Sequence, residues 1–125
     1  MDRHSRRAYI SGIIFCAAIP FAVAFLHDIF RPFYTTSDQD IVHVYEALRF
    51  NAGLSQEYAD HTGYIPFLLL SLWYHLIHLL GLLPIYRVDQ MPGPGPAFDE
   101  TISTLVVWAR AYTAAVSSAI VIAMA

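Results

Sequence analysis

Two short polar stretches hold the residues of this sequence that are best suited to chemistry. The first contains Asp38 and Asp40, and the second contains Asp60 followed directly by His61. A carboxylate can act as a general base toward a hydroxyl group, or help to bind a divalent metal through its oxygens. Asp60 could orient the imidazole of His61, or His61 could contact a phosphate. Asp38 and Asp40 are therefore the candidate catalytic residues, and Asp60 and His61 the candidate substrate-binding residues.

The same residues also have a structural interpretation. Asp38 and Asp40 fall in the first turn of an expected helix, where a carboxylate suits the positive end of the helix dipole. Asp60 can cap the helix that follows, next to tyrosines that fit a membrane interface. Capping alone needs only one of the first two aspartates, and it explains the pair Asp60 and His61 less well.

The helix expected to begin near Asp38 has apolar residues at helical spacing and a stop signal in Asn51, Ala52 and Gly53. Its apolar positions are Ile41, Val44, Tyr45 and Leu48, and His43, Glu46 and Arg49 lie elsewhere around it. This pattern predicts an amphipathic helix that lies along a membrane surface or packs on a helical bundle.

The composition is that of a membrane protein. Of the 125 residues, 57% are hydrophobic and 14% are charged, and the mean hydropathy is +0.48. A net charge of -3 without any lysine argues against nucleic-acid binding. The single cysteine, Cys16, excludes an intrachain disulfide, and we expect it to be a buried apolar residue.

Three apolar runs predict an all-α membrane protein with spans at about 8–27, 65–83 and 102–125. An outer loop at 28–64 and a cytoplasmic connector at 84–101 join them, and the Pro- and Gly-rich stretch 91–96 makes the connector short and stiff. A signal peptide is the alternative for the first run, although the residues around Leu26 lack a small-residue cleavage point.

Arginine placement predicts the orientation. Arg3, Arg6 and Arg7 precede the first run and Arg87 follows the second, which favours a cytoplasmic N-terminus and an outward-facing loop 28–64. We expect the chain in the bacterial inner (plasma) membrane.

The third run carries one charge, Arg110, and a face of small residues that lets helices approach closely in lipid. That face consists of Ala111, Ala115 and Ala119, beside Ala114 and Ser118. We expect partner helices from the same or another chain, and, because the run reaches Ala125 without a polar flank, a longer protein of which this is the front. Arg110 is expected to snorkel to the cytoplasmic face or to pair with an acid in the bundle.

His75 and His78 lie three residues apart in the second run. They could bind haem or a metal, but such a pair is more often hydrogen-bonded to neighbouring segments. We therefore expect no cofactor, with a divalent metal left open.

Taken in order, these features resemble the N-terminal part of the GT-C membrane glycosyltransferases, which use polyprenyl-phosphate sugar donors. The matching order is a basic start, a first span, an outer loop that opens with Ser37-Asp38-Gln39-Asp40, then Asp60-His61-Thr62-Gly63, and a later span containing Ala109-Arg110.

The resemblance implies a larger helical bundle in which an acid soon after the first span is the catalytic base. It assigns that role to Asp38, with Asp40 as the close alternative, and implies a donor-phosphate contact at His61. The function expected is sugar transfer at the outer membrane face. The alternatives are a non-catalytic membrane assembly protein and a small transporter component.

Overall fold

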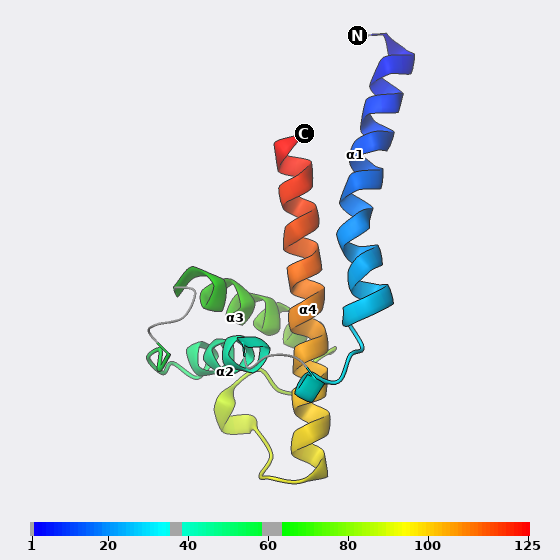
Figure 1. Cartoon of the computed structure of the whole chain (residues 1–125). Coiled ribbons are helices and arrows are strands. Elements are labelled where there is room, and N and C mark those ends of the chain that lie inside the picture. Colours follow the sequence, from blue (N-terminus) through cyan, green and yellow to red (C-terminus); the bar gives the residue numbers. More distant parts are fainter. Residues whose placement is uncertain (1, 36–38, 59–63) are drawn as a thin grey trace. The chain divides into compact units, whose positions relative to one another are not determined.

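The computed structural model describes residues 2–35, 39–58 and 64–125, and these residues form helices without any strand. The predicted all-α class is therefore confirmed. The elements are α1 (Arg3–Val23), the π-helical turn η1 (Ala24–Asp28), the 3-10 turn η2 (Phe33–Thr35), α2 (Gln39–Asn51), α3 (Tyr64–Leu79), the 3-10 turn η3 (Val88–Gln90) and α4 (Pro96–Met124) (Figure 1). They make two compact units, Met1–Arg31 with Arg110–Ala125, and Pro32–Ala109.

Two described helices are long and apolar enough to cross a membrane. One covers His4–His27 with a mean hydropathy of 2.2, and the other is α4 with 1.6. The first and third predicted spans therefore exist as helices of suitable length. Helix α4 begins at Pro96, six residues before the expected start at 102, because proline suits the first helical turn and Asp99 suits its positive dipole end.

The second predicted span is a shorter helix. Helix α3 has 16 residues, which gives a length of about 24 Å, whereas the hydrocarbon core is about 30 Å thick. Its last turn closes at Gly81, which has a φ of 74°. The N–H of Leu82 bonds back to the carbonyl of Ile77, and that of Gly81 to the carbonyl of His78, a Schellman motif that ends the helix.

In the first unit, α1 pairs with residues 110–125 of α4. The Tyr9 hydroxyl donates to the carbonyl of Ala125, the Ser118 hydroxyl donates to that of Ala17 at 2.6 Å, and Arg110 donates to that of Arg31 at 2.6 Å. Residues later in the first segment contact residues earlier in α4, so the two segments are antiparallel.

This pairing tests two expectations about the apolar runs. Ala114 and Ser118 of the small-residue face are buried, whereas Ala119 is exposed. Part of the face that was expected to receive partner helices thus lies within this unit. Cys16 was predicted to be buried, but it is exposed, because only the face of α1 that holds Ala17 turns inward.

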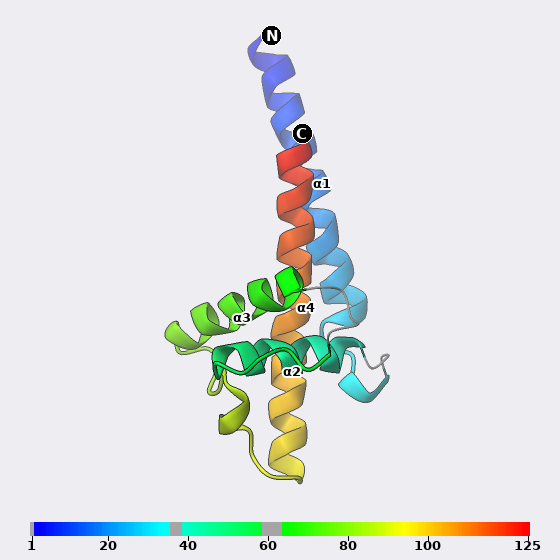
Figure 2. The ribbon, with the colours of Figure 1, turned by 90° about the vertical axis from the view of Figure 1, so that its left-hand side faces the viewer.

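In the second unit, α2 and α3 lie side by side and run across the first half of α4 rather than along it (Figures 1 and 2). The buried centre contains Val44 and Leu48 of α2, Phe67 and Tyr74 of α3, and Leu105 of α4. In each helix the buried apolar residues are spaced three or four positions apart, as is typical of amphipathic helices.

The two segments expected on opposite sides of the membrane lie together in this unit. Asn51, from the predicted outer loop, donates its side-chain N–H to the carbonyl of Tyr86, in the predicted cytoplasmic connector, at 3.0 Å. A hydrogen bond of that length cannot cross a bilayer. The structure thus brings residues of these two segments into direct contact.

Candidate functional site

Most of the residues selected from the sequence lie outside the described residues. This holds for Asp38, Asp60 and His61. Asp40 is the second residue of α2, and only its backbone is described. The helix predicted to begin near Asp38 begins at Gln39 and ends at Asn51. Gly53 follows in the left-handed conformation, at a φ of 74°, as the stop signal predicted.

The chain after α2 folds back onto α2 through a buried carboxylate. Glu46 is 0% exposed, and its Oε1 accepts the backbone N–H groups of Glu57, at 2.9 Å, and Tyr58, at 2.8 Å. Its Oε2 has no hydrogen-bond partner among the described residues. One side chain of α2 thus fastens the segment that leads directly to Asp60.

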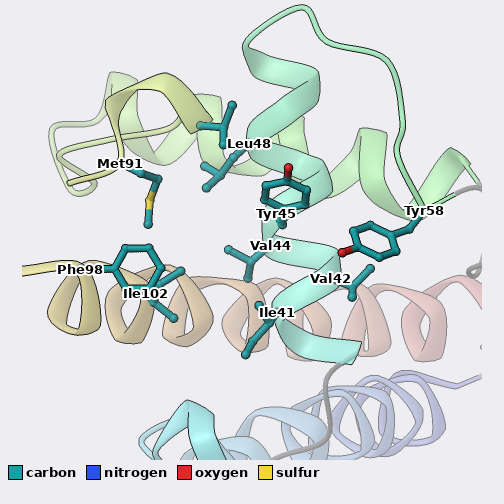
Figure 3. Close-up of a pocket in the computed structure, with 10 residues that line it drawn as sticks. Ile41, Val42, Val44, Tyr45, Leu48, Tyr58, Met91, Phe98 and Ile102 are labelled. Atoms are coloured by element: carbon teal, nitrogen blue, oxygen red, sulfur yellow. The ribbon is translucent and has the colours of Figure 1, made fainter. Parts of the chain in front are cut away.

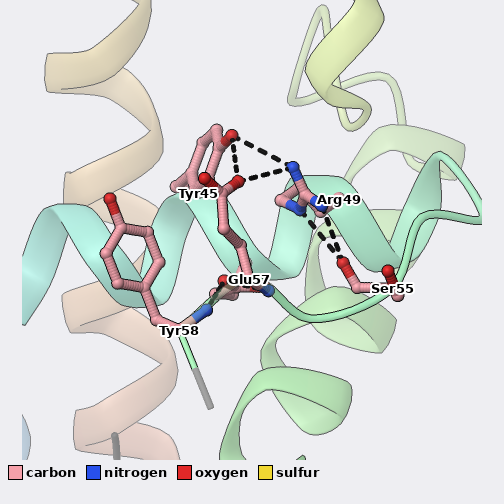
Figure 4. A network of polar contacts seen from close by, with 6 residues as sticks. Tyr45, Arg49, Ser55, Glu57 and Tyr58 are labelled. Atoms are coloured by element: carbon pink, nitrogen blue, oxygen red, sulfur yellow. Dashed lines mark hydrogen bonds and ion pairs between the residues drawn. The ribbon is translucent and has the colours of Figure 1, made fainter. Parts of the chain in front are cut away.

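A second set of contacts holds the same segment from the surface (Figure 4). The Tyr45 hydroxyl donates to Glu57 Oε2 at 2.9 Å, and Arg49 Nη1 donates to that oxygen at 2.7 Å and to the Tyr45 hydroxyl at 3.2 Å. Arg49 also donates twice to the carbonyl of Ser55, at 2.9 and 3.2 Å. The hydrogen bond with Tyr45, with a smaller contribution from the charge of Glu57, raises the pKa of the Arg49 guanidinium.

An apolar cavity of about 340 Å³ lies between α2 and the first part of α4, and Tyr45 and Tyr58 belong to its lining (Figure 3). Phe98 and Ile102 of α4 face Val44 of α2 across it, and Met91 lies at one end. The remaining lining residues are Ile41, Val42, Tyr45, Leu48, Tyr58 and Val88. A cavity of this size and character suits a hydrocarbon chain, with the tyrosines as its polar groups.

The two histidines of the second apolar run contact a tyrosine. The ring of His78 stacks on Tyr86 with centroids 4.4 Å apart, and the edge contact of His75 with Tyr86 is 5.0 Å. Nδ1 of His78 lies 2.7 Å from the carbonyl oxygen of Leu83. No group of three His, Cys, Asp or Glu side chains that could hold a metal occurs among the described residues.

Sequence reasoning missed the importance of Glu46 and Asn51. The spacing of apolar residues in α2 predicted that Glu46 lies outside the buried face. In the structure more than one face of α2 is covered, because α3, α4 and the returning segment 54–58 all pack on it. Asn51 was taken only as part of a helix stop. No local sequence pattern predicts either role, because the hydrogen-bond partners of Glu46 and Asn51 lie 11 to 35 positions away in the sequence.

The arrangement combines an apolar cavity, a fastened loop and the start of a helix that carries candidate carboxylates. It can hold a lipid chain in the cavity, with Tyr45 and Tyr58 as the polar groups of the lining. Comparison of the chain with protein-family models, with curated proteins and with solved structures finds no match.

Proposed function

We propose that these residues are the front part of a membrane glycosyltransferase that transfers a sugar from a polyprenyl-phosphate donor to an acceptor hydroxyl at the outer membrane face. Asp38 is the proposed general base, with Asp40 as the alternative, and His61, oriented by Asp60, contacts the donor phosphate. A general base of this kind removes the proton of the acceptor hydroxyl as the new bond to the sugar forms.

The observation that carries the proposal is the contact of Glu46 with the backbone of Glu57 and Tyr58. It fastens the chain to α2 two residues before Asp60, and two residues of chain span at most about 7 Å. Tyr58, the last described residue before Asp60, therefore lies against the helix whose first turn contains Asp40. This supports a common site for the two polar stretches.

The apolar cavity under α2 gives independent support. Its lining of aliphatic and aromatic side chains suits the isoprenoid chain of a lipid-linked donor better than a free nucleotide sugar, which would need charged or polar groups for its phosphates.

The test uses the complete gene product that carries these residues, in native membranes, with radiolabelled polyprenyl-phosphate sugars as donors. We expect transfer by the unchanged protein, loss of transfer in Asp38→Asn or Asp40→Asn, and normal transfer in the matched control Asp99→Asn, an exposed acid at the start of α4. Transfer that survives both substitutions at positions 38 and 40 overturns the assignment of the base.

One observation favours a second candidate, a non-catalytic assembly protein. Only 6% of the apolar window in His4–His27 is buried, so the surface of α1 is free to receive helices of another protein. In that case no sugar transfer is detected with any donor, and the complete protein is recovered from mild detergent in a larger complex that Ile14→Asn, on the exposed face of α1, disrupts.

A further inference from the structure

We infer that α3 lies in the plane of the membrane and presents a stripe of leucines to the lipid, so that the segment from α2 to the start of α4 stays on one side of the bilayer. The partner of this surface is the acyl region of a lipid bilayer. The inference concerns only how the chain meets the membrane, and it is independent of the proposed enzymatic activity.

Helix α3 has one outward face that is wholly apolar apart from His75 at its edge. The residues of this face recur three or four positions apart and are 37 to 71% exposed; they are Ile65, Leu68, Leu69, Leu72, Leu76 and Leu79. From Tyr64 to Tyr86 the sequence contains no Asp, Glu, Lys or Arg. A leucine stripe of this length on a helix is normally covered, because water contact with it is unfavourable.

Three polar side chains of α3, Ser71, Trp73 and Tyr74, turn away from that face. The Ser71 hydroxyl donates to Asn51 Oδ1 at 2.8 Å, Trp73 Nε1 donates to the carbonyl of Trp108 at 3.0 Å, and the Tyr74 hydroxyl donates to the carbonyl of Leu105 at 2.8 Å. A helix that hides its hydrogen-bonding groups against protein and leaves only hydrocarbon outside is suited to contact lipid.

The chain on either side of α3 shows that this helix does not cross the bilayer. Asn51 precedes α3 and Tyr86 follows it, yet they are joined by a hydrogen bond of 3.0 Å. After Gly81 the chain turns back, and Tyr86 stacks on His78 of α3 itself. The apolar residues from 80 to 86 therefore return along α3 and do not extend it.

Contacts with α4 indicate which side of the unit faces the lipid. Helix α3 contacts Leu105 and Trp108 of α4, whereas the cavity beneath α2 is lined by Phe98 and Ile102. The apolar end of α4 follows Trp108, whereas Asp99 lies in its first turn and Glu100 comes directly after it. Along α4, therefore, α3 lies toward the apolar end and α2 toward the polar end.

The aromatic residues around α3 fit lipid as the partner better than a second protein. Trp73, Trp108, Tyr64 and Tyr86 have apolar rings with a polar N–H or O–H group, the composition of the belts found at membrane–water interfaces. Two helices of the same chain are long enough to span a membrane, so a bilayer is adjacent in any topology that uses them.

The first experiment tests the side of the membrane. In a Cys16→Ser background, single cysteines replace Ser55, before α3, and Gly93, after it; both positions are exposed, and a Cβ at Gly93 meets no atom within 4 Å. Membrane-impermeant maleimide is applied to intact cells and to lysed cells. Both cysteines should react in the same preparation, and labelling from opposite sides would show that α3 spans and would overturn the inference.

The second experiment measures depth. A bimane fluorophore is attached to cysteine at Leu72, or at Glu100 as an exposed polar control, in vesicles of phosphatidylcholine and phosphatidylglycerol. Phosphatidylcholine brominated near the glycerol end of its chains should quench most of the fluorescence at position 72 and little of it at position 100. Equal weak quenching at both positions would show that protein or water covers α3, and strongest quenching by bromine near the chain ends would show a helix that crosses the core; either result overturns the inference.

Discussion

The side-chain amide of Asn51 lies 3.0 Å from the carbonyl oxygen of Tyr86 and 3.1 Å from that of Ser71, and its own oxygen accepts the Ser71 hydroxyl at 2.8 Å. One residue thus joins the end of α2 to the middle of α3 and to the chain that follows α3. These contacts hold the second unit together where its three segments meet.

Asn51→Ala should therefore destabilise the second unit. Removal of the amide leaves the carbonyls of Ser71 and Tyr86 and the Ser71 hydroxyl without their partner, at a cost of about 1–3 kcal/mol. Thermal unfolding in detergent micelles, followed by tryptophan fluorescence, measures the effect through Trp73 and Trp108, which belong to this unit. Gln56→Ala is the control, since its amide makes one exposed local bond to Tyr58, and equal unfolding temperatures for the two variants would refute the role of Asn51.

Glu46→Ala should release the segment that leads to Asp60. Without the carboxylate, the N–H groups of Glu57 and Tyr58 lose their acceptor, which costs about 1–3 kcal/mol for a buried group. Glu46→Gln keeps an acceptor oxygen and should retain more of the stability. Hydrogen exchange at the amides of Glu57 and Tyr58 is the direct measurement. The prediction requires the rates to rise from the unchanged protein through Glu46→Gln to Glu46→Ala, and unchanged rates in the alanine variant would contradict it.

Ala114→Leu should weaken the antiparallel pair of the first unit. Ala114 is 4% exposed and lies one turn before Ser118, which contacts Ala17. Three extra carbons in a packed site cost about 1–3 kcal/mol. Ala119→Leu adds the same atoms to an exposed position of the same helix and should have little effect. Cross-linking between cysteines placed at Tyr9 and Ala125, in a Cys16→Ser background, reports the pairing, and its yield should fall only in the variant at position 114.

The ion pair of Arg87 with Asp89 should make the turn at η3 sensitive to acid. Arg87 Nε and Nη2 donate to the two carboxylate oxygens at 2.9 and 3.0 Å, and these bonds lower the pKa of Asp89 from its ordinary value of 3.8. Because the folded pKa is the lower one, the stabilisation is fully present above pH 3.8 and is lost as the pH falls through the folded pKa. Both groups are exposed, so added salt should weaken the effect.

Carbon-13 NMR titration of the Asp89 carboxyl group checks this prediction. Arg87→Gln should move the midpoint upward toward 3.8, whereas Arg6→Gln, a charge change in the other unit, should leave it in place. A midpoint that does not respond to the loss of Arg87 would show that the pair does not form in solution.

The sequence predicted local elements well and their connections poorly. Helical spacing from Ile41 to Leu48 predicted α2, and Gly53 predicted its end, because these signals depend on neighbouring residues. The crossing expected for residues 65–83 was a prediction from hydropathy alone, and α3 is a shorter helix than predicted. Hydropathy measures only how apolar a segment is, and it does not detect the return of Tyr86 onto His78 or the bond from Asn51. Those contacts depend on residues distant in the chain.

In the candidate site, too, local features were predictable from the sequence and long-range contacts were not. Residue type was enough to select Asp38, Asp40, Asp60 and His61, and their roles stay predictions. The contact of Glu46 with the backbone of Glu57 and Tyr58 was not predictable, because Glu46 looks like an ordinary exposed residue of an amphipathic helix. Glu46 is buried because segment 54–58 folds back over α2. The residue pattern of one helix does not predict such a tertiary contact.

The antiparallel pairing of α1 with α4 has a consequence for how the protein is made. The residues that meet in the bond between Ser118 and Ala17 are 101 positions apart. At about 5–20 residues per second, α1 emerges from the ribosome about 5–20 s before its partner exists. In a two-span topology α1 stays in lipid without its partner helix through that interval, while the second unit is synthesised. The mean hydropathy of 2.2 for His4–His27 suits such an interval in lipid, and the later helix then assembles onto a helix that is already in place.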